Sequence, residues 1–396
     1  MAVAVASVYV HAPFCVRRCV YCDFAVTVSP SGDAPGWAEA LAAELAQVER
    51  EGVFGLAPRL ETLYVGGGTP SLLGAQAMRA LRGVIGPDRL AAPELEWTAE
   101  ANPESFDAEV GVAWRDAGVN RLSLGVQSFH GPTLRWMGRL HGPEGARAAV
   151  SAARDVGLGN VSIDLIFGLP TRVGRDWSRD LDSALALEVP HVSLYGLSVE
   201  PATPLGRAVA EGREPPVDEE RYREEFLEAA ERLRAAGYEH YEVSNFALPG
   251  HESRHNQVYW DGRPYLGLGN GAHSYGPPLR RWNVRDWGAY RARLSRGEPA
   301  EGGRELVDAD AEALERVWLG LRTSGGLPID DLGGEALDLV AAWEAQGLAE
   351  ATARRVRLTA EGWLALDGLA VALDGAISSA SERRPSTRRA LGLTRR

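Results

Sequence analysis

The chain has 396 residues and a mass of 42.6 kDa, a length that predicts one large domain accompanied by smaller ones. Its net charge of −12 argues against general nucleic-acid binding, and no apolar run approaches the roughly 20 residues of a membrane span. The three cysteines all lie between positions 15 and 22, which indicates metal ligation in a reducing compartment rather than a disulfide framework.

Short β-rich runs alternate with helical stretches in the first 240 residues, a pattern typical of βα units on a parallel sheet. The expected strands are Ser7–Val10, Glu61–Val65, Leu95–Glu100, Arg121–Gly125, Val161–Ile166 and His191–Tyr195. The expected helices are Trp37–Glu51, Ala75–Ile85, Pro143–Val156, Trp177–Ala186 and Glu219–Ala236. Polar or glycine-rich residues follow almost every strand, where βα-barrels place their active sites. Residues 1–240 are therefore predicted to form an α/β fold, an open (β/α)6 partial barrel.

The remaining residues divide into three predicted segments. Residues 241–305 form a linking region, which is rich in glycine, aromatic and histidine residues and is expected to consist of structured loops. Residues 306–377 predict a small, mostly helical domain of winged-helix type, with helices at Ala311–Leu321, Leu337–Gln346 and Ala360–Leu373 and a strand at Arg355–Leu358. Residues 378–396 contain six arginines and one glutamate, and we expect a disordered basic tail that could hold the protein loosely at an anionic membrane surface.

The cysteines have the spacing C-x3-C-x2-C at Cys15, Cys19 and Cys22, in a loop directly after the first expected strand. Three thiolates on one short loop can hold three irons of a cubane cluster, so that the fourth iron keeps an open coordination position. A zinc site completed by a histidine is the alternative, and its usual cysteine spacings fit this segment poorly. No basic region precedes the first apolar stretch, so we expect a cytoplasmic protein without a signal peptide.

This cysteine segment resembles the radical S-adenosylmethionine (SAM) superfamily. Within it, the chain from about Ser7 to Leu373 is similar to the branch that contains oxygen-independent coproporphyrinogen III dehydrogenase and the HemW haem chaperones. The resemblance implies a [4Fe–4S] cluster on the three cysteines, SAM on the open iron, and cleavage of SAM to a 5′-deoxyadenosyl radical. The positions that match contacts to the cluster-bound SAM are Tyr9, Gly67 and Glu100. The positions that match contacts to a second SAM in the dehydrogenase are Tyr21, Gly68, Thr69, Gln127, Arg139, Asp164 and Ser198.

Three features favour the chaperones within this branch. The dehydrogenase has a further cysteine at the position of Phe24 and a longer segment before the cluster loop, whereas only fourteen residues precede Cys15 here. The segment Arg254–Trp260 matches the H-N-x-x-Y-W motif of HemW, which implies that His255, Asn256, Tyr259 and Trp260 bind haem. A histidine nitrogen can be an axial ligand of haem iron, and aromatic rings can pack on the macrocycle. The alternative is a structural loop whose aromatic residues close the mouth of the barrel.

The expected function is therefore a haem chaperone that transfers haem to apo-haem proteins such as respiratory cytochromes, without coproporphyrinogen III dehydrogenase activity. The alternatives are that dehydrogenase reaction and a radical SAM reaction on another substrate. His251–His255 also satisfies the H-E-x-x-H pattern of zinc proteases, which requires both histidines on one helix face. Pro249 and Gly250 directly precede the pattern and no apolar helical period follows, so we do not expect a protease.

Overall fold

The computed structural model describes residues 2–382, which divide into two compact units. The first contains residues up to 240 together with 244–307, and the second contains 241–243 together with the residues from 308 onward. Helix α14 (Leu366–Glu382) covers the start of the segment that the sequence predicted as a tail, and residues 383–396 lie outside the described residues. No helix in the described part of the chain combines the length and the apolar character needed to cross a bilayer.

The centre of the first unit is a parallel sheet, and its six strands are those that the sequence predicted. They are β2 (Ser7–Ala12), β6 (Thr62–Gly67), β7 (Glu96–Ala101), β8 (Arg121–Gln127), β9 (Val161–Phe167) and β10 (His191–Gly196). Each strand pairs in parallel with the next one along the chain, which makes the open (β/α)6 arrangement. All six carboxyl ends therefore lie at the same edge of the sheet. Their mostly buried side chains form a continuous apolar core.

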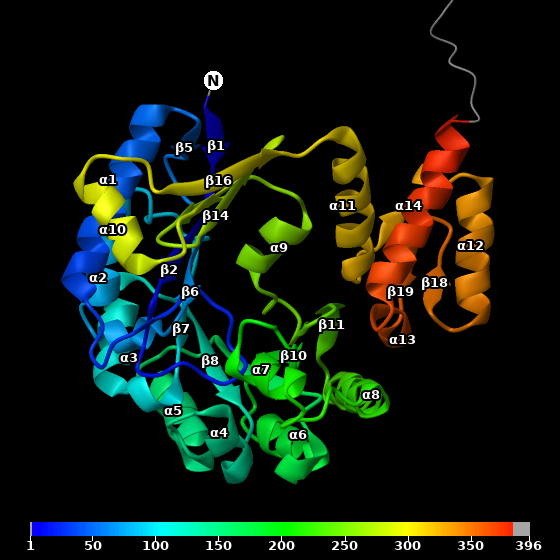
Figure 1. Cartoon of the computed structure of the whole chain (residues 1–396), viewed down its shortest axis with the longest axis horizontal. Coiled ribbons are helices and arrows are strands. Elements are labelled where there is room, and N and C mark those ends of the chain that lie inside the picture. Colours follow the sequence, from blue (N-terminus) through cyan, green and yellow to red (C-terminus); the bar gives the residue numbers. More distant parts are fainter. Residues whose placement is uncertain (1, 383–396) are drawn as a thin grey trace, which may run out of the picture. The chain divides into compact units, whose positions relative to one another are not determined.

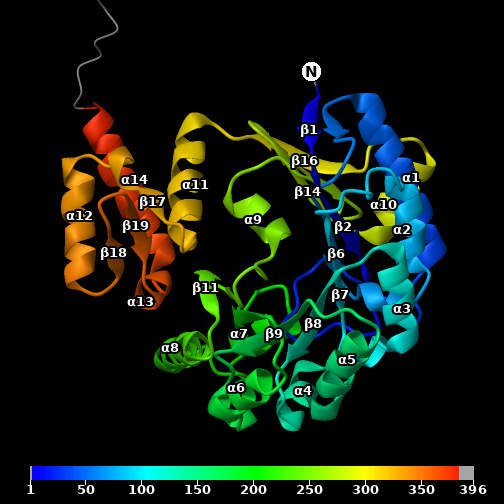
Figure 2. The ribbon, with the colours of Figure 1, turned by 180° about the vertical axis from the view of Figure 1, so that it is seen from behind.

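Helices cover the outer, convex face of this curved sheet (Figures 1 and 2). They are α1 (Ala34–Glu51), α2 (Ala77–Ile85), α3 (Ala108–Ala117), α5 (Pro143–Asp155), α6 (Trp177–Leu185) and α8 (Glu219–Ala235), while the shorter α4 (Gly131–Met137) and α7 (Pro204–Ala210) are hydrogen-bonded to Val20 in the loop that carries the cysteines. Four of them begin after an aspartate whose carboxylate accepts a hydrogen bond from a backbone N–H in the first turn: Asp33, Asp107, Asp176 and Asp218. Such capping satisfies donors that the helix leaves unpaired, so these residues fix where each helix starts.

The linking region contains more regular structure than the sequence predicted. Its segments are α9 (Arg254–Trp260), β13 (Leu266–Leu268), β14 (His273–Gly276), β15 (Leu279–Asn283), α10 (Trp287–Ser295) and β16 (Glu301–Leu306). Strand β13 adds to the sheet in parallel beside β2, while β12 (Asn245–Ala247) pairs antiparallel with β10. Strands β14, β15 and β16 form a separate antiparallel sheet. The edges of the partial barrel are thus covered by later parts of the chain, which limits exposed strand edges.

The second unit is mostly helical and has its own apolar core. Its elements are α11 (Ala309–Arg322), β17 (Leu327–Pro328), α12 (Gly334–Ala345), β18 (Ala349–Ala351), β19 (Arg355–Leu358), α13 (Ala360–Trp363) and α14. The three short strands form one antiparallel sheet in the order β17-β19-β18. Helix α14 packs against α11 and α12, and buried side chains such as Leu321, Trp343 and Leu373 fill the space between these elements. Four helices with a small antiparallel sheet correspond to the predicted mostly helical, winged-helix type.

Candidate cofactor site at the carboxyl ends of the strands

A cavity of about 890 Å³ opens at the carboxyl ends of the parallel strands. All three cysteines line it, together with every residue that the sequence predicted to contact SAM: Tyr9, Tyr21, Gly67, Gly68, Thr69, Glu100, Gln127, Arg139, Asp164 and Ser198. The most distant of these residues, Tyr9 and Ser198, are 189 positions apart in the chain. Because strand ends converge there, the parallel sheet alone is enough to bring them together.

The cysteine loop leaves β2 and is held on one side by a two-stranded pairing between β3 (Phe14–Cys15) and β4 (Thr27–Val28). All three thiols are half-buried and free. The Thr69 hydroxyl lies 3.5 Å from the Cys15 sulfur, and an Arg139 N–H lies 3.9 Å from the Cys19 sulfur. Burial raises the pKa of Cys15 to about 11 and also raises that of Cys22, so both thiols must lose a proton when they bind metal.

The glycine segment after β6 lies against Glu100, at the end of β7. The Glu100 carboxylate accepts hydrogen bonds from the Gly67 N–H at 2.9 Å and from the Tyr64 hydroxyl at 2.8 Å. An added Cβ on Gly66 would approach a Glu100 oxygen to 2.7 Å, and Gly67 has a φ of +110°. These positions therefore require glycine, because larger residues would displace Glu100 or strain the backbone. Burial raises the pKa of Glu100, because the charged carboxylate loses contact with water.

A second group of polar side chains gathers over Gly125 in β8. A Cβ placed on Gly125 would lie 2.9 Å from Gln127 Nε2, 3.0 Å from Asn102 Oδ1 and 3.2 Å from an Arg139 nitrogen. Arg139 donates to Asn102 Oδ1 at 2.6 Å and to the Gly125 carbonyl at 2.5 Å, and Asn102 in turn donates to the Thr69 hydroxyl at 3.1 Å. Asn102 thus connects two predicted residues, although the sequence analysis had assigned it no role. Gln127 has a φ of +67°, a strained conformation that side chains seldom adopt outside functional sites.

The floor of the cavity consists of aromatic and acidic side chains. The Tyr9 ring stacks on Tyr64 with centroids 6.1 Å apart, and burial raises the pKa of both phenols. Asp164, in β9, accepts a hydrogen bond from Ser123 at 3.2 Å. Burial, reinforced by the nearby Glu100 charge, raises the pKa of Asp164 to about 7. Two half-buried carboxyl groups with raised pKa values in one cavity are typical of a functional site.

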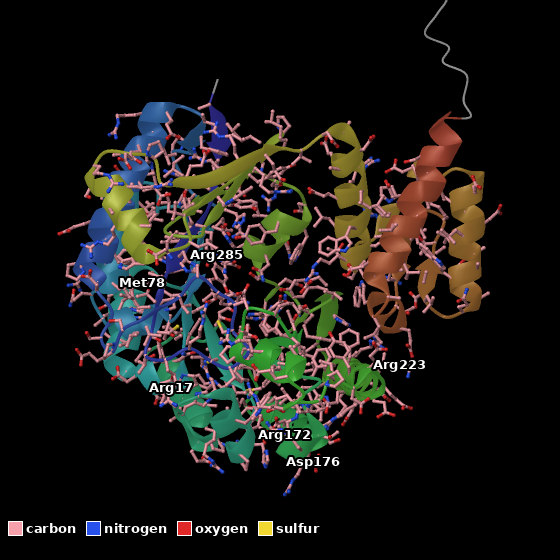
Figure 3. The ribbon with its side chains drawn as sticks, viewed as in Figure 1. Arg17, Met78, Arg172, Asp176, Arg223 and Arg285 are labelled. Atoms are coloured by element: carbon pink, nitrogen blue, oxygen red, sulfur yellow. The ribbon has the colours of Figure 1, made fainter. Side chains whose placement is uncertain are left out.

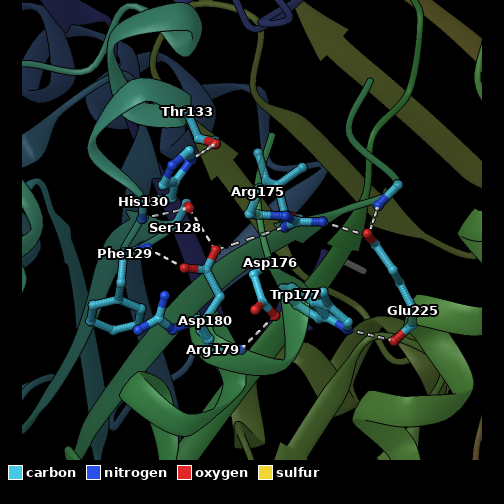
Figure 4. A network of polar contacts seen from close by, with 12 residues as sticks. Ser128, Phe129, His130, Thr133, Arg175, Asp176, Trp177, Arg179, Asp180 and Glu225 are labelled. Carbon is cyan, nitrogen blue, oxygen red and sulfur yellow. Dashed lines mark hydrogen bonds and ion pairs between the residues drawn. The ribbon is translucent and has the colours of Figure 1, made fainter. Parts of the chain in front are cut away.

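A buried network of charges holds the carboxyl ends of β8 and β9 in place (Figure 4). The guanidinium of Arg175 lies between two carboxylates, at 2.5 Å from Glu225 and 3.9 Å from Asp180. Asp180 accepts hydrogen bonds from the residues that follow Gln127, which are Ser128 at 2.5 Å and the Phe129 N–H at 2.9 Å. Glu225 accepts from the N–H of Gly168, directly after β9, at 2.7 Å. Because partners surround each charge, the network can remain ionised and fix the loops that follow β8 and β9, the strands of Gln127 and Asp164.

The H-N-x-x-Y-W segment is a helix, α9, rather than the expected loop, and it lies at the opposite end of the barrel. Glu96, the first residue of β7, accepts hydrogen bonds from the N–H groups of Arg254 and His255, each at 2.9 Å. The His255 ring is 1% exposed, with Nδ1 2.7 Å from the Thr62 hydroxyl and Nε2 2.8 Å from the Tyr259 hydroxyl. Burial lowers the pKa of His255 to about 3, so the ring is neutral.

Of the four residues that the resemblance assigned to haem, the cavity lining includes Tyr259 but not His255, Asn256 or Trp260. The helix starts at Arg254, after Ser253 as its cap, so His251 precedes it. The two histidines of the H-E-x-x-H pattern therefore do not share a helix face, in agreement with the prediction that this is no zinc-protease site.

The geometry fits a cluster with SAM better than a single zinc ion. Among residues 2–382, no three His, Cys, Asp or Glu side chains converge closely enough to hold one metal ion, although the three thiols line one cavity. The Arg139 Nε is buried without a hydrogen-bond partner in the described structure, which leaves a donor for an absent ligand. Cys15, Cys19 and Cys22 would hold the cluster, and Glu100 and Arg139 would bind SAM. The two groups together supply one-electron radical chemistry, while the chain positions and shields them.

Known proteins resemble this chain along most of its length. The family model of the radical SAM superfamily matches residues 9–184. The protein named Heme chaperone HemW from Mycobacterium tuberculosis is 40% identical over 374 residues, which cover 93% of this chain and 94% of the relative. The chain belongs to the HemW family of radical SAM proteins. Members of this superfamily carry a [4Fe–4S] cluster and SAM, in agreement with the prediction for this chain.

A second HemW chaperone and one solved structure are also similar to this chain. Heme chaperone HemW from Bacillus subtilis is 35% identical over 324 residues, which cover 81% of this chain and 84% of the relative. A solved structure of coproporphyrinogen III oxidase (HemN) from Escherichia coli, described as a radical SAM enzyme, superposes with a TM-score of 0.77. That comparison covers 94% of this chain and 90% of the other, at 23% identity. It confirms the predicted fold of the family and carries no further information about activity.

Proposed function

We propose that this chain is a haem chaperone, which binds haem and transfers it to apo-haem proteins while it carries a [4Fe–4S] cluster and SAM. The observation that carries the proposal is the similarity to HemW chaperones along nearly the whole chain, at 40% identity over 94% of one such relative. Phe24 adds support, because it stands where the related dehydrogenase has a further cysteine. Respiratory cytochromes are the recipients that we propose.

Haem titration of the cluster-loaded chain, with an anaerobic coproporphyrinogen III assay in parallel, tests this function. We expect haem to bind with a defined stoichiometry, and we expect no protoporphyrinogen IX. Decarboxylation requires each propionate to be held next to the radical, and a displacement of about 1 Å can reduce such a rate by about 100-fold. Protoporphyrinogen formed together with stoichiometric 5′-deoxyadenosine would instead identify the chain as the dehydrogenase. A chain that binds no haem and forms no product would indicate another radical SAM reaction.

We also propose that the arginine-rich end of the chain brings the protein to an anionic membrane surface. The proposal rests on composition alone, namely six arginines against one glutamate in residues 378–396. Basic residues near such a surface contribute about 1 kcal/mol each. Co-sedimentation with phosphatidylserine liposomes at low salt should therefore decrease when the chain ends at residue 377. Equal sedimentation of the two chains would contradict the proposal.

A further inference from the structure

Two histidine rings line the cavity that holds the cysteines, and their hydrogen bonding differs. His11 is buried, and both of its ring nitrogens have partners: the Tyr9 hydroxyl at 3.0 Å from Nδ1 and the Ala25 carbonyl at 3.0 Å from Nε2. His273 is exposed, and its Nδ1 lies 3.2 Å from the Gly271 carbonyl. A carbonyl can only accept a hydrogen bond, so Nδ1 of the neutral ring carries the proton and Nε2 carries the lone pair. No hydrogen bond from residues 2–382 reaches that Nε2.

This arrangement is the one that metal-binding histidines adopt. Such a histidine commonly donates its second ring N–H to a backbone carbonyl, which fixes the tautomer and the orientation of the ring. His255 has the opposite character, because it is buried and both of its nitrogens are already hydrogen-bonded. Binding iron through His255 would require one of these bonds to break and the buried ring to become accessible. In the observed structure, His273 is the ring that can accept a metal.

The backbone that presents His273 is held firmly. Asn270 donates to two carbonyls, that of Ala25 at 3.2 Å and that of Arg285 at 2.7 Å, and therefore connects this segment to the cysteine loop. The buried Glu44 carboxylate, in α1, accepts a hydrogen bond from the Gly269 N–H at 2.7 Å. From His273 onward the chain pairs with β15, where its partner is Trp282. A ligand on such a support needs little ordering when a metal binds.

The surroundings of His273 suit a planar, anionic group. A Cβ added to Gly271 would lie 2.9 Å from the Ala25 Cβ, so the end of the cysteine loop packs directly on this segment. The preceding residue, Phe24, is 61% exposed and lines the same cavity. Arg285, labelled in Figure 3, is exposed at the cavity; it donates to the Asp23 carbonyl at 2.6 Å and lies 3.8 Å from the exposed Asp23 carboxylate. An exposed imidazole, an exposed aromatic ring and a guanidinium thus belong to neighbouring segments that line the same cavity.

We propose that His273 Nε2 is the axial ligand of haem iron in this chain, with the macrocycle over Phe24 and a haem carboxylate toward Arg285. The proposal rests on the proposed haem-binding function and assigns its site. It places haem at the carboxyl ends of the strands, in the same cavity as the cysteines, and gives α9 a structural role. The phenyl ring of Phe24 supplies apolar contact to the macrocycle, and the guanidinium supplies charge to a propionate.

Haemin titration of the full, cluster-loaded chain tests the site, with difference absorption spectra and EPR of the ferric haem as readouts. His273→Ala should weaken haem binding by at least about tenfold, since even the loss of a group that supports a metal ligand costs 10- to 100-fold. It should also change the axial-ligand signature, and added imidazole should restore the wild-type spectrum. His273→Tyr should give the spectrum of a phenolate-ligated haem. His255→Ala should keep the wild-type signature, as should His251→Ala, a histidine outside the cavity.

Cluster iron content and SAM binding, measured in the same samples, report whether each variant folds. A wild-type haem spectrum in both His273 variants would overturn the proposed ligand while leaving the haem chaperone function intact. Loss of the signature in His255→Ala, with the cluster retained, would return the ligand to α9. If the wild-type chain binds no haem at all, the proposed function itself fails, and this result is distinct from either of the others.

Discussion

Asn102 connects the two halves of the cofactor cavity at the scale of a single residue. Its amide donates to the Thr69 hydroxyl beside Cys15 and accepts from Arg139, which approaches Cys19. One side chain therefore orients a hydroxyl and a guanidinium that both face the cysteine loop. Groups that orient a binding residue in this way commonly affect affinity almost as much as the direct contacts.

Asn102→Ala should accordingly weaken SAM binding to the cluster-loaded chain. The substitution removes one partner from each of Thr69 and Arg139, and the loss of a buried hydrogen-bond partner costs about 1–3 kcal/mol. Isothermal titration with SAM measures the change. Asn160→Ala, which removes a half-buried asparagine next to the amino end of β9, should leave SAM affinity unchanged. Equal SAM affinity in Asn102→Ala and wild type, at equal iron content, would show that Asn102 has no part in the site.

Residues close together in the sequence were predicted better than residues that only the fold brings together. Cys15, Cys19 and Cys22 are recognisable because their spacing alone defines a cluster site. Asn102 followed an expected strand, and only its contacts to Thr69 and Arg139 reveal its place. The state of a histidine is even less visible in the sequence, because it depends on a carbonyl at Nδ1 and on the degree of burial.

At the scale of elements, the sequence predicts the six strands and most of their helices because each is long enough to show its period. Helix α9 was missed because its seven residues show no apolar period, and much of its stability comes from tertiary contacts. Ser253 caps it locally, but Glu96, which binds two of its N–H groups, lies 158 and 159 positions away in the chain. Strand β13 has only three residues, Leu-Gly-Leu, and becomes a strand because the edge of β2 is open to it. Short elements of this kind depend on the fold around them rather than on local propensity.

At the scale of the first unit, the two ends of the barrel have different roles. The carboxyl ends of the strands carry the cofactor cavity, while α9 lies at the amino ends of β6 and β7. The Tyr64 ring connects them, because it stacks on His255 at 5.1 Å and its hydroxyl donates to Glu100. Two fully buried histidines, His191 and His255, lie at the amino ends of the strands, and burial lowers the pKa of both. The stability of the unit should therefore depend on pH.

We expect the contribution of His255 to the free energy of unfolding to fall as the pH decreases below about 6.5, the ordinary pKa of histidine. The unfolded chain binds a proton at His255 in this range, whereas the folded chain does not until about pH 3. Each such histidine removes about 1.4 kcal/mol of stability per pH unit between the two pKa values. Glu44 and Asp164, whose pKa values burial raises to about 7, act in the opposite direction, so the test compares the slopes of variant and wild type. His255→Gln should lower stability at pH 7, because glutamine fills the site imperfectly. It should also reduce the slope of the free energy of unfolding against pH, between about pH 6 and 5, by the equivalent of about one proton.

Urea denaturation followed by circular dichroism, at equal cluster content, measures this slope. Thr62→Val is the matched control: it removes the hydroxyl partner of Nδ1 but retains the buried imidazole, so the protein should be less stable at every pH with an unchanged slope. The two variants separate loss of packing from loss of a titrating group, because only the second alters proton uptake on unfolding. If the free energy of unfolding of His255→Gln had the same slope against pH as that of the wild type, His255 would already be protonated in the folded chain. Alternatively, the amino-end side of the barrel would open to water before the chain unfolds.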